Sequence, residues 1–120
     1  MVRIFMLTSA LAGCSAIDGF YTGECTLEVG DQKKVYELEL EIDQEDDDLM
    51  GDARVSHKDT YDEGEIAGSI NDDEAPMEIR FQGIWSANNM DLDGSLDGRH
   101  IKGGCSFGNN FGSFDVIRNH

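Results

Sequence analysis

Apolar and polar residues alternate along most of the chain after residue 19. Between residues 36 and 42 every second residue is apolar, and the residues between them are glutamates. This period of two is typical of a strand with one buried face in an antiparallel sheet. Similar runs predict strands at residues 20–29, 34–43, 49–57, 65–71, 77–84, 90–96, 100–107 and 111–118.

Turn-forming residues separate these strands, and no segment after residue 19 has a convincing helical pattern. The turn segments are residues 30–31, 45–48, 72–74, 97–98 and 108–110. Asp97-Gly98 is a strong signal for a two-residue hairpin. Eight short strands with short links predict an all-β fold, an antiparallel up-and-down barrel of about eight strands, with a β-sandwich as the alternative.

Glycines recur within the predicted strands, in phase with the apolar face. They are Gly23, Gly51, Gly68, Gly83, Gly94, Gly103 and Gly112. Glycine inside a strand marks a bulge, a bend or the close approach of another backbone. Repeated inward glycines therefore favour strongly bent strands that close into a small barrel.

The chain from residue 19 resembles the small meander barrels of the avidin and lipocalin type, including a final run Gly112-Ser113-Phe114-Asp115-Val116-Ile117-Arg118 that is similar to their closing strands. The resemblance is architectural and implies a barrel, but it carries over no ligand. If the interior is a pocket, its lining residues are expected to be Tyr21, Tyr36, Leu38, Leu40, Phe81, Trp85, Leu92 and Phe107. The alternative is that these side chains fill an ordinary core, as in many small barrels.

The first fourteen residues have a different character. Arg3 precedes an apolar run over residues 4–12, which is too short to span a bilayer, and Leu11-Ala12-Gly13-Cys14 follows. This segment resembles a bacterial lipoprotein signal peptide with its lipobox. The resemblance implies cleavage before Cys14, diacylglycerol on its sulfur and an acyl chain such as palmitate on the new amino terminus. The alternative is that residues 4–11 form a buried strand or helix.

The expected organisation is therefore a signal peptide over residues 1–13, a lipidated tether over 14–18 and a single β-barrel domain over 19–120. Two or more acyl chains give stable anchoring, so no transmembrane helix is needed. Ser15 after Cys14 resembles the pattern of lipoproteins sorted to the outer membrane. We expect a location in the bacterial cell envelope.

Acidic residues dominate the chain, whose formal net charge is −16. Removal of residues 1–13 would take away only Arg3 among the charged side chains and leave −17. Such a surface repels nucleic acid phosphates, so a nucleic acid partner is not expected. A cationic protein or a small apolar ligand fits the composition better, although surface charge can also be a high-salt adaptation.

Cys25 and Cys105 remain as an even pair if Cys14 is lipidated. Exported proteins meet an oxidising compartment, so a disulfide between them is expected, and their spacing does not fit a zinc site. They fall in the first and seventh predicted strands, with the eighth strand between them in a closed barrel. Either the barrel is flattened so that they meet across its interior, or the strand count differs.

Alternating links of a meander bring residues 44–48, 72–74 and 97–98 to one end of the barrel, together with the tether. This end is strongly acidic. We hypothesise that its carboxylates bind Ca²⁺ or Mg²⁺ weakly, the alternative being a solvated rim; the residues concerned are Asp46, Asp47, Asp48, Asp72, Asp73 and Glu74.

The sequence contains one candidate catalytic group, which consists of His57 with Asp59 and Tyr61 nearby. No serine or cysteine nucleophile accompanies it in the sequence, so it does not indicate nucleophilic catalysis. We therefore predict a non-enzymatic, membrane-anchored envelope lipoprotein that is a binding or interaction module. An inhibitor-like module or a small envelope hydrolase is the alternative.

Overall fold

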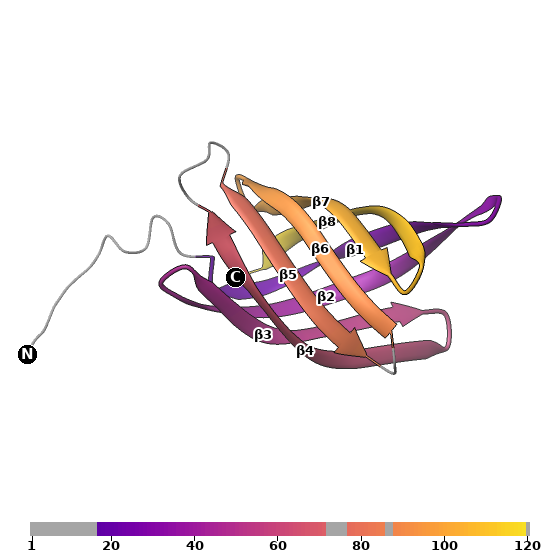
Figure 1. The fold of residues 1–120 in the computed structure, drawn as a ribbon, viewed down its shortest axis with the longest axis horizontal. Coiled ribbons are helices and arrows are strands. Elements are labelled where there is room, and N and C mark those ends of the chain that lie inside the picture. The colour runs from indigo at the N-terminus through magenta and orange to yellow at the C-terminus, as the bar shows by residue number, and fades with distance from the viewer. Residues whose placement is uncertain (1–16, 72–76, 86–87, 120) are drawn as a thin grey trace, which may run out of the picture.

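Eight strands form the protein in the computed structural model, which describes residues 17–71, 77–85 and 88–119. Their bounds are β1 Gly19–Val29, β2 Gln32–Glu45, β3 Asp48–His57, β4 Thr60–Asn71, β5 Glu78–Trp85, β6 Asn88–Asp97, β7 His100–Phe107 and β8 Asn110–Asn119. Each strand pairs antiparallel with the next, and β8 pairs with β1, so the sheet closes into an up-and-down barrel (Figure 1). The predicted barrel is confirmed over the sandwich.

The inward residues of all eight strands form one hydrophobic core. Its fully buried side chains come from both ends of the sequence, for example Tyr21 and Leu38 near the start and Ile101 and Val116 near the end. No polar or charged residue is buried among the part of the chain that the structure describes. The alternation seen in the sequence therefore separates an apolar interior from a charged outer wall.

The strand β4 begins earlier than the sequence predicts. The strand predicted at residues 65–71 starts at Thr60 instead, because Lys58 and Asp59 form a two-residue turn and Thr60 already pairs with His57. Residues 60–65 pair with β3, whereas the ladder between β4 and β5 begins only at Ile66. Asp62 and Gly64 of this segment pair with the core residues Val55 and Ala53 but are not apolar themselves, so the sequence pattern resembles a loop.

The predicted hairpin near Asp97 is confirmed, but its turn lies one residue later. Asp97 pairs with His100, and Gly98 and Arg99 form the turn. Gly98 has a φ of 65°, a conformation that glycine adopts without strain.

A disulfide joins Cys25 of β1 to Cys105 of β7, as expected, although β8 lies between these strands. The two Cα atoms are 6.7 Å apart, whereas two strands that flank a third are ordinarily about 9.6 Å apart. Gly112 of β8 pairs with both Cys105 and Leu27. A Cβ atom on Gly112 would lie closer than 3.0 Å to the backbone of Thr26. The strand count is therefore correct, and close approach at this glycine accompanies the meeting of β1 and β7.

Inward glycines allow neighbouring strands to approach closely at other positions of the barrel as well. A Cβ atom would come closer than 3.0 Å to the backbone of a neighbouring strand at each of Gly23, Gly51, Gly68, Gly94, Gly103 and Gly112. Real Cβ atoms essentially never come so close. The glycine pattern of the sequence thus marks the positions where the strands bend over one another, as predicted.

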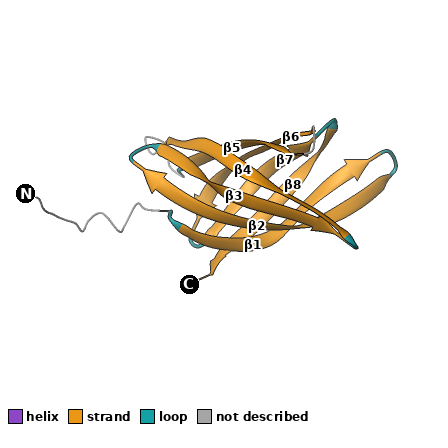
Figure 2. Ribbon diagram, turned by 90° about the horizontal axis from the view of Figure 1, so that it is seen from below, coloured by secondary structure: helices purple, strands orange, loops and turns teal. Residues whose placement is uncertain are grey.

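The barrel is uneven in length. The ladder between β1 and β8 ends at Glu28, and the ladder between β2 and β3 starts at Glu37, so the tip of the β1–β2 hairpin extends past its neighbours (Figure 2). The turns Gly30–Asp31 and Lys58–Asp59 lie toward this end, and the turns at residues 46–47 and 98–99 lie at the other. The described residues include no helix that is long and apolar enough to cross a membrane.

Candidate functional site

The residues proposed to line an interior pocket lie in the hydrophobic core. Tyr21, Leu38, Leu40, Phe81 and Leu92 are each at most 1% exposed and belong to one packed cluster. Tyr36 and Phe107 are partly buried against that cluster, and their rings meet edge to face with centroids 6.2 Å apart. The side chain of Trp85 lies outside the described residues. Residues that fill one another's surroundings in this way favour the filled-core alternative.

The acidic turn at residues 46–47 lies against the end of β4. The carbonyl of Asp47 accepts a hydrogen bond from the backbone N–H of Ile70 at 2.9 Å, so this turn and the chain leaving β4 share one end of the barrel, as the meander predicts. Asp72, Asp73 and Glu74 lie outside the described residues. Over the ranges that the structure covers, no group of three His, Cys, Asp or Glu residues could hold a metal ion, so binding of Ca²⁺ or Mg²⁺ at Asp46, Asp47 and Asp48 stays a hypothesis.

His57 makes contacts with β2. Its Nδ1 atom lies 3.0 Å from the carbonyl oxygen of Val35, and its ring lies 4.9 Å from that of Tyr36. These contacts cover the part of β2 that extends beyond β3.

The first described residues are fixed to the acidic end of the barrel. Ile17 is 1% exposed, and its N–H donates to Oε1 of Gln44 at 2.8 Å. The hydroxyl of Tyr21 donates to the carbonyl of Ile17 at 2.9 Å, and Arg118 donates to the carbonyl of Asp18 at 2.8 Å. We call these contacts the N-terminal latch, and they place the chain that enters β1 at the end predicted for the tether.

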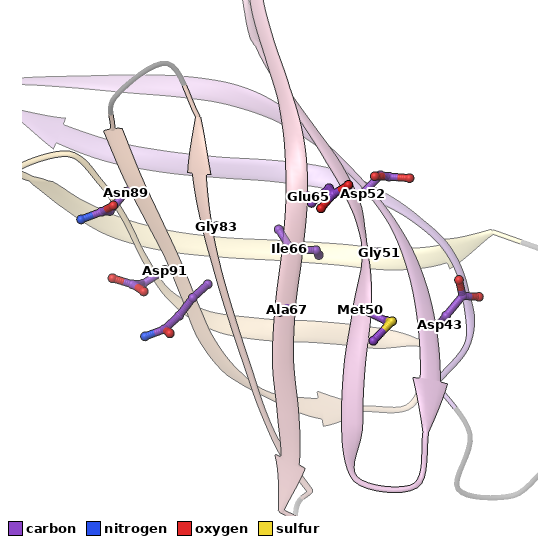
Figure 3. Close-up of a pocket in the computed structure, with 11 residues that line it drawn as sticks. Asp43, Met50, Gly51, Asp52, Glu65, Ile66, Ala67, Gly83, Asn89 and Asp91 are labelled. Carbon is purple, nitrogen blue, oxygen red and sulfur yellow. The ribbon is translucent and has the colours of Figure 1, made fainter.

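A groove crosses the outer wall from β2 to β6, with a volume of about 1070 Å³ (Figure 3). We call it the acidic groove. It is lined by Asp43, Met50, Gly51, Asp52, Glu65, Ile66, Ala67, Gln82, Gly83, Asn89 and Asp91. In Figure 3, Asp52 and Glu65 point outward on one side of it, and Asn89 and Asp91 lie on the other.

Two of the recurring glycines lie in the lining of this groove. At Gly51 the backbone of β3 approaches that of β2 so closely that a Cβ atom would contact the carbonyl of Glu41. Gly51 and Gly83 both line the groove and have no side chain. Gly51 therefore lies both at a close approach of two strands and in the lining of the groove.

A second groove of about 510 Å³ continues the acidic groove over β1 to β4. The two grooves share Asp52 and Glu65. The second one is lined by Phe20, Glu39, Glu41, Asp52, Ala53, Arg54, Glu63, Gly64 and Glu65. Phe20 is 40% exposed, so an apolar ring is available beside these carboxylates.

The strand register arranges the charges of this wall in two rows. In one row Arg54 stands between Glu39 and Glu63 and forms ion pairs with them at 3.7 and 3.1 Å. The hydrogen bonds that the Arg54 guanidinium donates to the carboxylate of Glu63 raise the pKa of Arg54. This row is therefore neutralised in part by its own cation.

The next row holds three carboxylates. Glu41 of β2 pairs with Asp52 of β3, which pairs with Glu65 of β4. Residues directly opposite on neighbouring strands have Cβ atoms about 5 Å apart, and like charges there are destabilising. None of the ion pairs among the described residues includes any of the three.

Sequence patterns alone could not locate the acidic groove. The glutamates at residues 37–41 identify an outward face, but only the register shows that Glu41, Asp52 and Glu65 form one row.

No protein-family model and no sequence among the curated proteins matches this chain. The function is therefore argued from its own residues.

Proposed function

We propose that the chain is a non-enzymatic, membrane-anchored lipoprotein of the bacterial envelope, whose barrel binds a partner through its outer wall. The observation that carries the binding role is the contrast between a filled interior and a hollowed wall. Five of the residues considered for an interior pocket are at most 1% exposed, whereas the acidic groove has a volume of about 1070 Å³. A surface hollow of this size is accessible to a partner without any change of fold.

The proposed anchor is Cys14, within Leu11-Ala12-Gly13-Cys14. Cys14 is three positions before Ile17, the residue held by the N-terminal latch. Two acyl groups on such a residue are sufficient for stable anchoring. Together with Ser15, the motif supports attachment to the outer membrane, with the acidic end of the barrel directed toward the bilayer.

The described histidines support a binding role over a hydrolytic one. His57 contacts the carbonyl of Val35, and His100 contacts Asp115 at 2.7 Å across the pairing of β7 and β8. Both therefore participate in contacts between strands. A hydrolase would need a base directed toward a substrate site.

Detergent phase partitioning of cells that express the full-length chain tests the anchor. We expect the wild-type protein in membranes after a high-salt wash and in the detergent phase after extraction. Cys14→Ser should move it to the aqueous phase, whereas the neighbouring Ser15→Ala should not. Aqueous partitioning of the wild type, or unchanged partitioning of Cys14→Ser, would refute the lipoprotein proposal.

A further inference from the structure

We propose that the acidic groove binds an extended, lysine- or arginine-rich polypeptide segment across β2 to β6. This inference rests on the proposed function, in which the barrel acts through its outer wall, and it specifies the class of partner. It is carried by the hollow itself, the charge row that the register creates and the exposed apolar surface of the groove.

The charge row gives the groove its complementarity to cations. Asp52 and Glu65 line the acidic groove, and Glu41, which pairs with Asp52, lines the adjoining second groove. None of the three carboxylates belongs to an ion pair among the described residues. Elsewhere on the wall, the structure pairs Asp93 with Arg80 and Asp115 with His100. A bound cation would relieve the repulsion within the unpaired row, whereas an anion would increase it.

The dimensions of the groove fit a polypeptide better than a compact ion. Five neighbouring strands spaced about 4.8 Å apart span about 19 Å, the length of roughly six extended residues. Asp43, Asp52 and Glu65 lie toward one side and Asp91 toward the other. No three described carboxylates converge as metal ligands. Distributed negative charge of this kind matches cationic side chains at alternate positions of an extended segment.

The groove also offers contacts that a small inorganic cation would not use. Met50 is 56% exposed, and Ala67 is exposed beside it. Lysine and arginine place aliphatic stems along apolar surface while their charged ends remain in water. The side-chain amides of Gln82 and Asn89, which also line the groove, can bond to a peptide backbone.

Calorimetric titration of the full-length protein in detergent with a synthetic decapeptide of alternating lysine and alanine tests this proposal. The same peptide with acetylated lysines is the ligand control. The test variant is Asp52→Asn/Glu65→Gln, which removes two charges from the groove. The matched control is Asp31→Asn/Glu45→Gln, which removes two charges from exposed positions that do not line it.

We expect saturable binding of the lysine peptide, no binding of the acetylated one, and an affinity about tenfold or more weaker for Asp52→Asn/Glu65→Gln. The matched control should change the affinity less than about twofold, because screening at 0.15 M salt limits the effect of distant charges. If both variants bind the lysine peptide equally weakly, the effect of charge is non-specific and the proposal is overturned. The proposal is also overturned if the wild type does not bind the peptide.

Calcium supplies a further decisive comparison. If calcium chloride alone produces saturable binding that the groove variant abolishes, the site is a metal site and the polypeptide assignment is overturned. Circular dichroism of both variants establishes that they are folded. These outcomes are independent of Cys14→Ser partitioning, so failure of the groove proposal is distinguishable from failure of the lipid anchor.

Discussion

Gly103 and Gly104 are neighbours on β7 but have opposite surroundings. A Cβ atom on Gly103 would come closer than 3.0 Å to backbone atoms of Asp93 and Gly94, whereas on Gly104 the nearest atom is 3.8 Å away. The first position therefore excludes any side chain, and the second accepts one. The difference reflects the inward and outward faces of a single strand.

This contrast predicts opposite effects on stability. Gly103→Ala should lower the free energy of unfolding by about 2–3 kcal/mol, because the strands must separate to admit the methyl group. Gly104→Ala should leave it unchanged or raise it by up to about 1 kcal/mol, because alanine restricts the unfolded chain. Urea denaturation of both variants measures this, and equal effects would contradict the close approach of β6 and β7.

Tyr21 links the core to the N-terminal latch. Burial raises the pKa of its phenol, although the nearby Arg118 acts in the opposite direction. The unfolded chain therefore loses this proton at a lower pH than the folded chain. The stability associated with Tyr21 should be present below pH about 10, the unfolded pKa, and be lost as the pH rises further.

Tyr21→Phe should remove this part of the alkaline destabilisation. At pH 7 it should cost about 1 kcal/mol, because the hydrogen bond to the carbonyl of Ile17 is lost. Urea midpoints of the wild type and the variant at pH 8 and pH 10.5 provide the measurement. If the urea midpoint falls by the same amount between pH 8 and pH 10.5 in both proteins, Tyr21 has no role in the alkaline loss of stability.

At the scale of the strands, most of the fold follows from local pattern. The period-two alternation in β2 and the turn residues at 30–31 identify strands and turns because each depends on a few adjacent residues. The beginning of β4 does not follow, because residues 60–65 pair only with β3 and lack apolar alternation. Likewise, the acidic groove depends on how the five strands β2 to β6 align, which no single segment encodes.

The disulfide connects strands that are not neighbours in the sheet. Cys25 and Cys105 are 80 residues apart, so the bridge restricts a long loop of the unfolded chain. Cys25→Ala/Cys105→Ala should lower the free energy of unfolding by about 4 kcal/mol on the chain-entropy model. Cys14→Ser should leave barrel stability unchanged in thermal denaturation, and equal losses in the two variants would contradict the assigned pairing.

At the scale of the whole molecule, self-repulsion is the dominant electrostatic feature. The chain carries a formal net charge of −16, and Glu41, Asp52 and Glu65 are opposed on neighbouring strands. At an ionic strength of about 0.1–0.15 M, salt largely screens repulsion between exposed charges that are more than about 8–10 Å apart, and higher salt shortens this distance. The charge of the wall therefore reduces the stability of the isolated barrel and makes it sensitive to ionic strength.

The melting temperature should rise between 10 and 500 mM sodium chloride. At low salt, Asp52→Asn/Glu65→Gln should melt higher than the wild type, because opposed like charges cost about 0.2–1 kcal/mol per pair. Asp31→Asn/Glu45→Gln should give a smaller gain, since neither residue belongs to the row. A melting temperature that falls with salt would contradict this account.

The most direct test of the lipid-anchored, disulfide-bridged barrel is the intact mass of the protein from its native membrane fraction, before and after reduction. We predict the mass of residues 14–120 plus acyl groups, with a gain of two hydrogens on reduction of Cys25–Cys105. The mass of the unprocessed chain, without acyl groups, would contradict the account and return Cys14 to the question of which cysteines pair.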